Sequence, residues 1–143
     1  MKKKAIIISL SGTKLSKKEI ILLKKKPWGV ILFSRNLKSI KQIKELTSKI
    51  KYYSKDRKFP IIIDEEGLSV SRLRKIINHN ISANFFGKLF TKNRTFSTKI
   101  YEHYLKSICK ILKDLGFNIN TIPVIDVLRD YTHKIISDRS FSK

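Results

Sequence analysis

Acidic side chains follow two of the apolar segments of this chain, near the points where those segments end. The acidic run at 64–66 comes directly after the isoleucines at 61–63, and Asp126 lies near the end of the apolar segment at 119–127. If these segments are parallel strands, their carboxyl ends meet at one edge of the sheet, where α/β folds place their functional groups. We therefore expect these carboxylates to lie close together in a binding or catalytic site.

Glu65 and Glu66 are adjacent acids, but their spacing does not suit a catalytic pair. Neighbouring residues in an extended segment point to opposite faces, whereas two carboxyl groups that act together on one bond face each other at about 5 Å. The histidines offer no alternative centre. His79 and His103 have no partners at metal-ligand spacing, and His133 is interpreted as a loop residue.

Hydrophobic patterning predicts the strands that would position these acids. Four short apolar segments are typical of strands buried on both faces: 5–10, 29–33, 61–63 and 119–127, the last interrupted by Pro123. Such strands indicate an α/β fold with a parallel sheet covered by helices. An open doubly wound sheet and a (β/α)8 barrel both fit this pattern. No glycine-rich phosphate loop follows the first strand, which counts against a nucleotide-binding sheet.

Helix signals alternate with the strands. Ser16 and Ser39 each begin a capping box, with Glu19 and Gln42 three residues later. The second of these helices has an apolar face made of Ile40, Ile43, Leu46 and Ile50. A third helix is predicted over 97–115, with Gly116 in the position that ends helices. The region 68–96 is expected to form short helices and loops.

The charge of the chain suggests nucleic acid as a partner, but its distribution does not. The 143 residues carry a net charge of +21, from lysines scattered along the whole length without a block of five or six like charges. Trp28 and most phenylalanines lie in apolar segments typical of core. We therefore expect no specific nucleic-acid binding, and keep a basic nucleic-acid-binding protein as an alternative. The single cysteine, Cys109, is expected to be a buried thiol, and no segment reaches the apolar length of a membrane span.

Three segments in register carry a resemblance to a known family. They are Gly29-Val-Ile-Leu-Phe-Ser-Arg-Asn36, Ile63-Asp-Glu-Glu-Gly67 with Val70 and Arg72 close behind, and Pro123-Val-Ile-Asp126 followed by Ser137-Asp-Arg-Ser-Phe141. Together they resemble the bacterial cytoplasmic β-N-acetylhexosaminidases of glycoside hydrolase family 3, from near residue 5 to the last residue. The resemblance implies the N-terminal half of a (β/α)8 barrel, with residues 1–143 forming part of the catalytic domain.

The resemblance also implies a retaining glycosidase that removes terminal β-linked N-acetylhexosamine in the recycling of cell-wall sugars. Its partner would be a carbohydrate, an N-acetylglucosaminide or a muropeptide-like substrate, and it would need no metal or organic cofactor. Substrate-binding positions match Asp64, Arg72 and Arg139, and supporting positions match Glu66, Asp126 and Asp138. A carboxylate can accept two hydrogen bonds from adjacent sugar hydroxyls, and arginine offers a rigid fork of donors.

Alternatives stay open for each of these residues and for the chain. Asp64 could instead cap a helix, and Arg139 could pair with Asp138 or Asp126 to hold a loop. For Arg72 the alternative is Arg74, which lies on the same short segment. No residue of this chain matches the family's acid/base histidine or its nucleophile, so a chain truncated at residue 143 is expected to be inactive alone. Exposed barrel edges could then promote self-association. A non-catalytic half-barrel that binds carbohydrate or a partner subunit is the remaining alternative.

Four positions depart from the family pattern. After the third strand the family pattern reads Asp-Gln-Glu-Gly-Gly-Arg. This chain has Glu65, Leu68 and Ser69 at the second, fifth and sixth places of that pattern, and Ser137 replaces a glycine further along. Leu68 in place of a glycine puts the tight turn beside the pocket in doubt.

Overall fold

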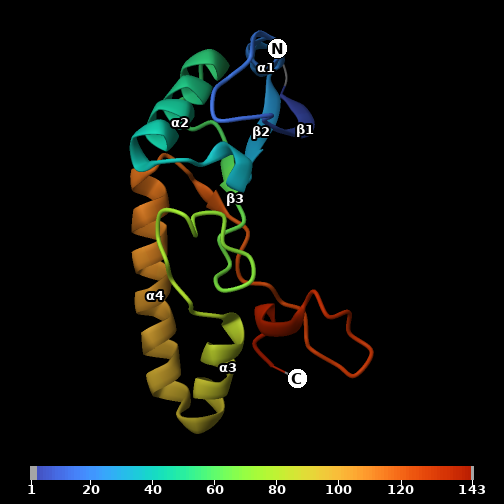
Figure 1. Ribbon diagram of the computed structural model, residues 1–143, viewed down its shortest axis with the longest axis vertical. Coiled ribbons are helices and arrows are strands. Elements are labelled where there is room, and N and C mark those ends of the chain that lie inside the picture. Colours follow the sequence, from blue (N-terminus) through green and yellow to red (C-terminus); the bar gives the residue numbers. More distant parts are fainter. Residues whose placement is uncertain (1–2, 143) are drawn as a thin grey trace. The chain divides into compact units, whose positions relative to one another are not determined.

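The computed structural model describes residues 3–142, in two compact units that the chain enters twice each (Figure 1). The first unit combines Met1–Ile63 with Ile111–Asn120, and the second combines Asp64–Lys110 with Thr121–Lys143. The strands belong to the first unit. The acidic run that starts at Asp64 belongs to the second.

The first unit is a parallel sheet with the strands in sequence order. Strand β1 (Lys4–Ser9) pairs with β2 (Pro27–Leu32), β2 with β3 (Ile61–Ile63), and β3 with the short β4 (Ile119–Asn120). This arrangement confirms the predicted α/β class with parallel strands. The fourth strand is much shorter than the predicted 119–127, because its partner β3 ends at Ile63, which pairs with Asn120. Further along, Pro123 has no N–H to donate to a neighbouring strand.

Capping by serine side chains determines where the first two helices begin. Helix α1 (Lys17–Lys24) starts after Ser16, whose hydroxyl accepts from the Glu19 amide, and Glu19 returns the bond to the Ser16 amide at 2.7 Å. Helix α2 (Ile40–Ser54) starts after Ser39. There the predicted reciprocal bond is displaced, because Gln42 Oε1 accepts from the amide of Lys38 rather than from that of Ser39.

The core of the first unit is formed by the central strands and the helices that cover them. Val30, Leu32, Ile61 and Ile63 are completely buried, together with Ile43 and Ile50 of α2. The expectation that every strand is buried on both faces is wrong for β1, which lies at the edge of the sheet. Ile6 and Ile7 are 54% and 49% exposed, and Trp28 and Ile40 are also exposed.

The second unit contains two helices and long loops. Helix α3 (Ala83–Lys92) begins after Ser82, and α4 (Arg94–Asp114), whose last residues belong to the first unit, starts three residues earlier than predicted. A 3₁₀ turn, η2 (Ser137–Arg139), lies near the C-terminus, and a second 3₁₀ turn, η1 (Ser34–Asn36), lies in the first unit. Cys109 is exposed, so its predicted burial is wrong. Among the described residues, no helix is long and apolar enough to cross a membrane.

Candidate functional site

Asp64 is the first residue after β3, and its two carboxylate oxygens have different partners. Oδ2 accepts a hydrogen bond from Nη2 of Arg72 at 3.1 Å, and Oδ1 accepts one from the hydroxyl of Thr121 at 2.8 Å. The Asp64 and Arg72 side chains are 19% and 28% exposed. A carboxylate has about four acceptor positions, so Asp64 can still accept bonds from a ligand while its orientation is fixed.

Arg139 binds Glu66 through a two-pronged ion pair. Nε donates to Oε2 at 2.7 Å and Nη2 donates to Oε1 at 3.0 Å. The hydrogen bonds to Glu66 raise the pKa of Arg139; burial lowers it by less, and the charges of Glu66, Asp126 and Asp64 raise it further. The predicted alternative, a pair with Asp138 or Asp126, is therefore replaced by a pair with Glu66. The carboxylate of Glu66 thus holds the guanidinium of Arg139.

Glu65 is almost completely buried and connects the acidic run to two aromatic side chains. One oxygen accepts from the amides of Arg72 and Leu73, at 2.8 and 2.9 Å, and the other lies 2.7 Å from Nε2 of His79. The hydroxyl of Tyr104 lies 3.4 Å from Nδ1 of the same histidine. Burial, the charge of Glu65 and that of Tyr101 raise the pKa of Tyr104 to about 12. The backbone that carries Arg72 is held by this network.

The turn after the acidic run is tight despite the leucine at position 68. Gly67 has φ +129°, and a Cβ there would lie 2.2 Å from the carbonyl oxygen of Ile81, so only glycine fits. The amides of Glu66 and Gly67 both donate to the carbonyl of Val70. The tight turn therefore depends on Gly67, and it forms even though leucine replaces the family's glycine at position 68.

The loop at 126–142 is tied by side-chain hydrogen bonds rather than by regular structure. The hydroxyl of Ser140 donates to the carbonyl of Asp126 at 2.8 Å, and Ser69 donates to the carboxylate of Asp138. Ser137, at the position where the family pattern has glycine, adopts φ +32°. Asp126 and Asp138 thus make contacts that hold the loop.

All six predicted site residues belong to the second unit, and four of them form two ion pairs, Arg72 with Asp64 and Arg139 with Glu66. Sequence reasoning missed Thr121, His79 and Tyr104. Thr121 directly follows β4, a position that could have identified it. For His79 and Tyr104 the sequence offers no signal, because their contacts to the acidic run depend on the path of the loop at 68–82.

No family model matches the chain. Among curated proteins, it is 32% identical over 114 residues to a β-hexosaminidase of Hydrogenovibrio crunogenus, a match over 79% of this chain and 31% of that protein. It is 30% identical over 138 residues to the β-hexosaminidase of Methylobacillus flagellatus, over 95% of this chain and 39% of that protein. The predicted resemblance to the bacterial β-hexosaminidases is confirmed. The chain spans about two fifths or less of the length of these β-hexosaminidases.

Solved structures agree on the fold. NagZ from Neisseria gonorrhoeae superposes with a TM-score of 0.87 at 24% identity, over 98% of this chain and 41% of NagZ. A glycoside hydrolase family 3 β-N-acetylglucosaminidase from a Paenibacillus strain superposes with a TM-score of 0.60 at 21% identity, over 83% of this chain and 22% of that one. NagZ has also been solved in complex with N-trifluoroacetyl-D-glucosamine.

Proposed function

We propose that this chain supplies the part of a retaining β-N-acetylhexosaminidase that holds the terminal N-acetylhexosamine of an N-acetylglucosaminide or muropeptide-like substrate. The observation that carries the proposal is the Asp64 carboxylate, oriented by Arg72 and Thr121 and still partly exposed. Two adjacent equatorial hydroxyls of a pyranose can donate to such a carboxylate. Arg139, held by Glu66, would provide N–H donors to the sugar oxygens.

The catalytic step itself would use groups outside the three segments that carry the resemblance. Retaining glycosidases need a proton donor and a nucleophile on opposite sides of the bond. Glu65 and Glu66 support neighbouring groups instead, because Glu65 accepts from two amides and faces His79, while Glu66 binds Arg139. The role proposed for Asp64 is therefore to position the sugar, while Glu65 and Glu66 hold neighbouring groups. The proposed activity requires the complementary parts of the longer β-hexosaminidases.

The volume of the cavity beside Arg139 affects the expected affinity for a sugar. A cavity lined by Glu66, Arg139, Phe86 and Tyr104 among others measures only about 20 Å³, much less than a sugar ring needs. The sugar would bind at an open surface, with few contacts. We expect a weak complex, with a dissociation constant in the millimolar range or above.

Saturation-transfer NMR on the 143-residue chain tests this proposal. N-Acetylglucosamine should receive saturation from the protein, and Asp64→Asn should reduce the signal at least threefold, because an amide nitrogen replaces one acceptor. Asp130→Asn is the matched control: it removes the same charge from an exposed loop position of the same unit. An equal signal from wild type and Asp64→Asn would contradict the assignment of Asp64. It would favour a half-barrel with another partner.

We further propose that the enzyme works in the cytoplasm, in the recycling of cell-wall sugars. The support is the family resemblance, together with the pairing of β1 with β2, which makes the apolar segment near the N-terminus part of the sheet. Fractionation of cells that express the tagged chain, with a cytoplasmic and a periplasmic marker, tests this location.

A further inference from the structure

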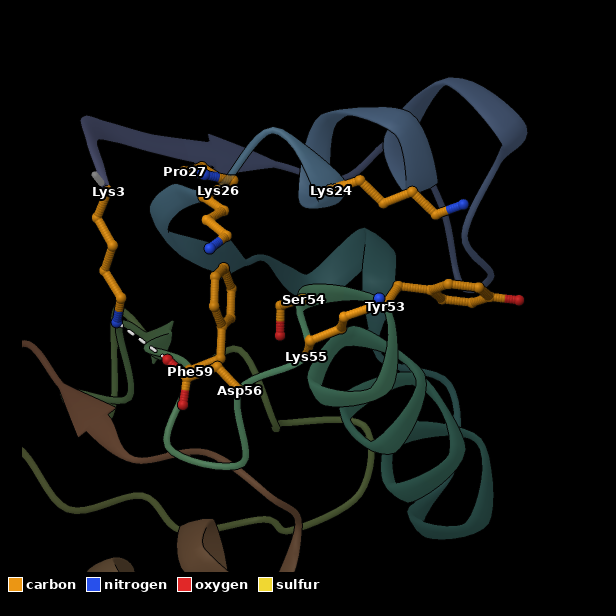
Figure 2. Close-up of a pocket in the computed structure, with 9 residues that line it drawn as sticks. All are labelled: Lys3, Lys24, Lys26, Pro27, Tyr53, Ser54, Lys55, Asp56 and Phe59. Atoms are coloured by element: carbon orange, nitrogen blue, oxygen red, sulfur yellow. Dashed lines mark hydrogen bonds and ion pairs between the residues drawn. The ribbon is translucent and has the colours of Figure 1, made fainter. Parts of the chain in front are cut away.

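A large cavity lies in the first unit, where β1 and β2 begin and where α1 and α2 end (Figure 2). Its volume is about 660 Å³, and small-molecule sites in proteins typically measure roughly 300–1,000 Å³. Phe59 and Pro27 are buried and form its apolar floor, and Tyr53 is half-buried at one side. The cavity is therefore large enough for a small organic or inorganic ligand.

Lysines dominate the rim of this cavity. Four of its nine lining residues are lysines, with Asp56 as the one acid. Lys3 binds Asp56 at 3.0 Å, whereas no carboxylate of the described residues lies within 4.0 Å of the Lys24, Lys26 or Lys55 ammonium groups. Figure 2 shows Lys26 above the Phe59 ring. The cavity thus has a net charge of about +3, counted from its side chains at neutral pH.

The backbone at two of these lysines is unusual. Lys26 and Lys55, which follow the ends of α1 and α2, have φ values of 57° and 55°. Glycine is the preferred residue in this left-handed conformation at helix ends, and a side chain there costs free energy. Lysine occupies both positions even so, and both side chains line the same cavity.

We propose that this cavity binds an oligophosphate, a small anion with two or more phosphate groups. Lys24, Lys26 and Lys55 line the same cavity, and none of them has a carboxylate partner among the described residues. A multiply charged anion in the cavity would offset their charge. Lysine binds phosphate as a compact point charge. Ser54 also lines the cavity, but its hydroxyl donates to the carbonyl of Lys51, so the lysines carry the proposal. The site lies in the first unit, whereas all the proposed sugar-binding residues belong to the second.

Helix dipoles offer a competing explanation for the same lysines. The carboxyl ends of α1 and α2 carry partial negative charge, which favours cations nearby without any ligand. The two explanations predict different results. If the lysines only offset the dipoles, replacing them lowers stability and pyrophosphate has no specific effect. If they form a site, replacing them removes pyrophosphate binding.

Isothermal titration calorimetry of the 143-residue chain with sodium pyrophosphate, at constant ionic strength, tests the proposal. Wild type should bind with one site, and Lys26→Gln with Lys55→Gln should weaken binding at least tenfold. The matched control, Lys41→Gln with Lys49→Gln, removes the same charge from exposed positions of α2 outside the cavity. Its affinity should stay within about twofold of wild type, since diffuse charge contributes mainly through screened, long-range attraction.

A second pair of changes separates binding from folding. Lys26→Gly with Lys55→Gly should keep or raise the thermal midpoint, because glycine suits the left-handed conformation, and should abolish the upward shift that pyrophosphate gives to wild type.

The proposal is overturned if wild type shows no binding, if the glutamine variant binds like wild type, or if the control loses as much affinity. If the cavity variants fail to fold, the test is the set of backbone amide NMR shifts that pyrophosphate changes in wild type. Changes spread over both units would contradict a site, and changes confined to the cavity would support it.

Discussion

The buried carboxylate of Glu65 lies 2.7 Å from Nε2 of His79, and its other oxygen accepts from the amides of Arg72 and Leu73. His79→Ala removes one partner of a buried charge, so we expect the free energy of unfolding to fall by about 1–3 kcal/mol. Chemical denaturation followed by circular dichroism measures this change. His103→Ala, on an exposed position of α4, should change the stability by less than about 0.5 kcal/mol. Equal effects of the two substitutions would refute a structural role for the Glu65–His79 contact.

Ser137 has φ +32° at the position where the family pattern has glycine. Ser137→Gly should raise the free energy of unfolding by about 1 kcal/mol, since the left-handed conformation costs a side chain about 1–2 kcal/mol and glycine loses part of that gain to its more flexible unfolded chain. Ser137→Ala retains Cβ and should give no such gain. A thermal or urea titration of the three proteins compares them. A loss of stability in Ser137→Gly would show that the hydroxyl contributes more than the backbone conformation costs.

Tyr104 makes the second unit sensitive to high pH. Burial, the charge of Glu65 and that of Tyr101 raise its pKa from the ordinary value of 10.0 to about 12. Because the folded pKa is the higher one, this contribution to stability is complete below pH 10 and is lost as the pH rises towards about 12. Tyr104→Phe should lose less stability over this range than wild type, and Tyr52→Phe, at a 75% exposed position, should behave like wild type. Denaturation at several alkaline pH values, with the phenolate absorbance recorded in parallel, makes the comparison.

Sequence patterns were most reliable where a local signal determines the structure. The Ser16 capping box, the strand at 61–63 and the helix end at Gly116, with φ +94°, all appear as expected. Each depends on residues within a few positions of one another. The strand at 119–127 was overestimated because apolar composition alone does not show whether a neighbouring strand is available for pairing.

The sequence nominated residues for the site, but it did not predict their contacts. Strand ends identified Asp64, and the family resemblance identified Arg72 and Arg139. That Arg139 would bind Glu66, 73 positions away, follows from loop paths that no short pattern encodes. The burial of Cys109 failed for a related reason: helical periodicity alone does not determine which side of a helix meets the rest of the protein.

A polypeptide of these 143 residues should not hydrolyse a chromogenic N-acetylglucosaminide. By the family resemblance, the proton donor and the nucleophile match no residue of this chain. General acid–base catalysis alone contributes about 10²–10⁴-fold to the rate, and loss of the nucleophile removes the covalent route altogether. The assay compares purified protein with a mock purification from cells that carry an empty vector. This expectation would be contradicted if the purified protein showed turnover above the mock value and if Asp64→Asn abolished that turnover.

The edge strand β1 should make the chain associate with itself. Ile6 and Ile7 are about half exposed, and among the described residues β1 pairs only with β2, so its other edge has backbone groups available for a second copy. Such an edge invites strand pairing. The high net charge opposes contact, but salt screens it beyond about 8 Å under physiological conditions, so burial at contact range should prevail.

We expect sedimentation velocity to show dimers or larger species that increase with concentration. Ile7→Lys, a charge on the edge strand, should shift the distribution towards monomer, whereas Tyr52→Lys on α2 should not. A wild-type monomer at all concentrations that binds no hydrophobic dye would show that the edge is protected, and the proposed association would then be wrong.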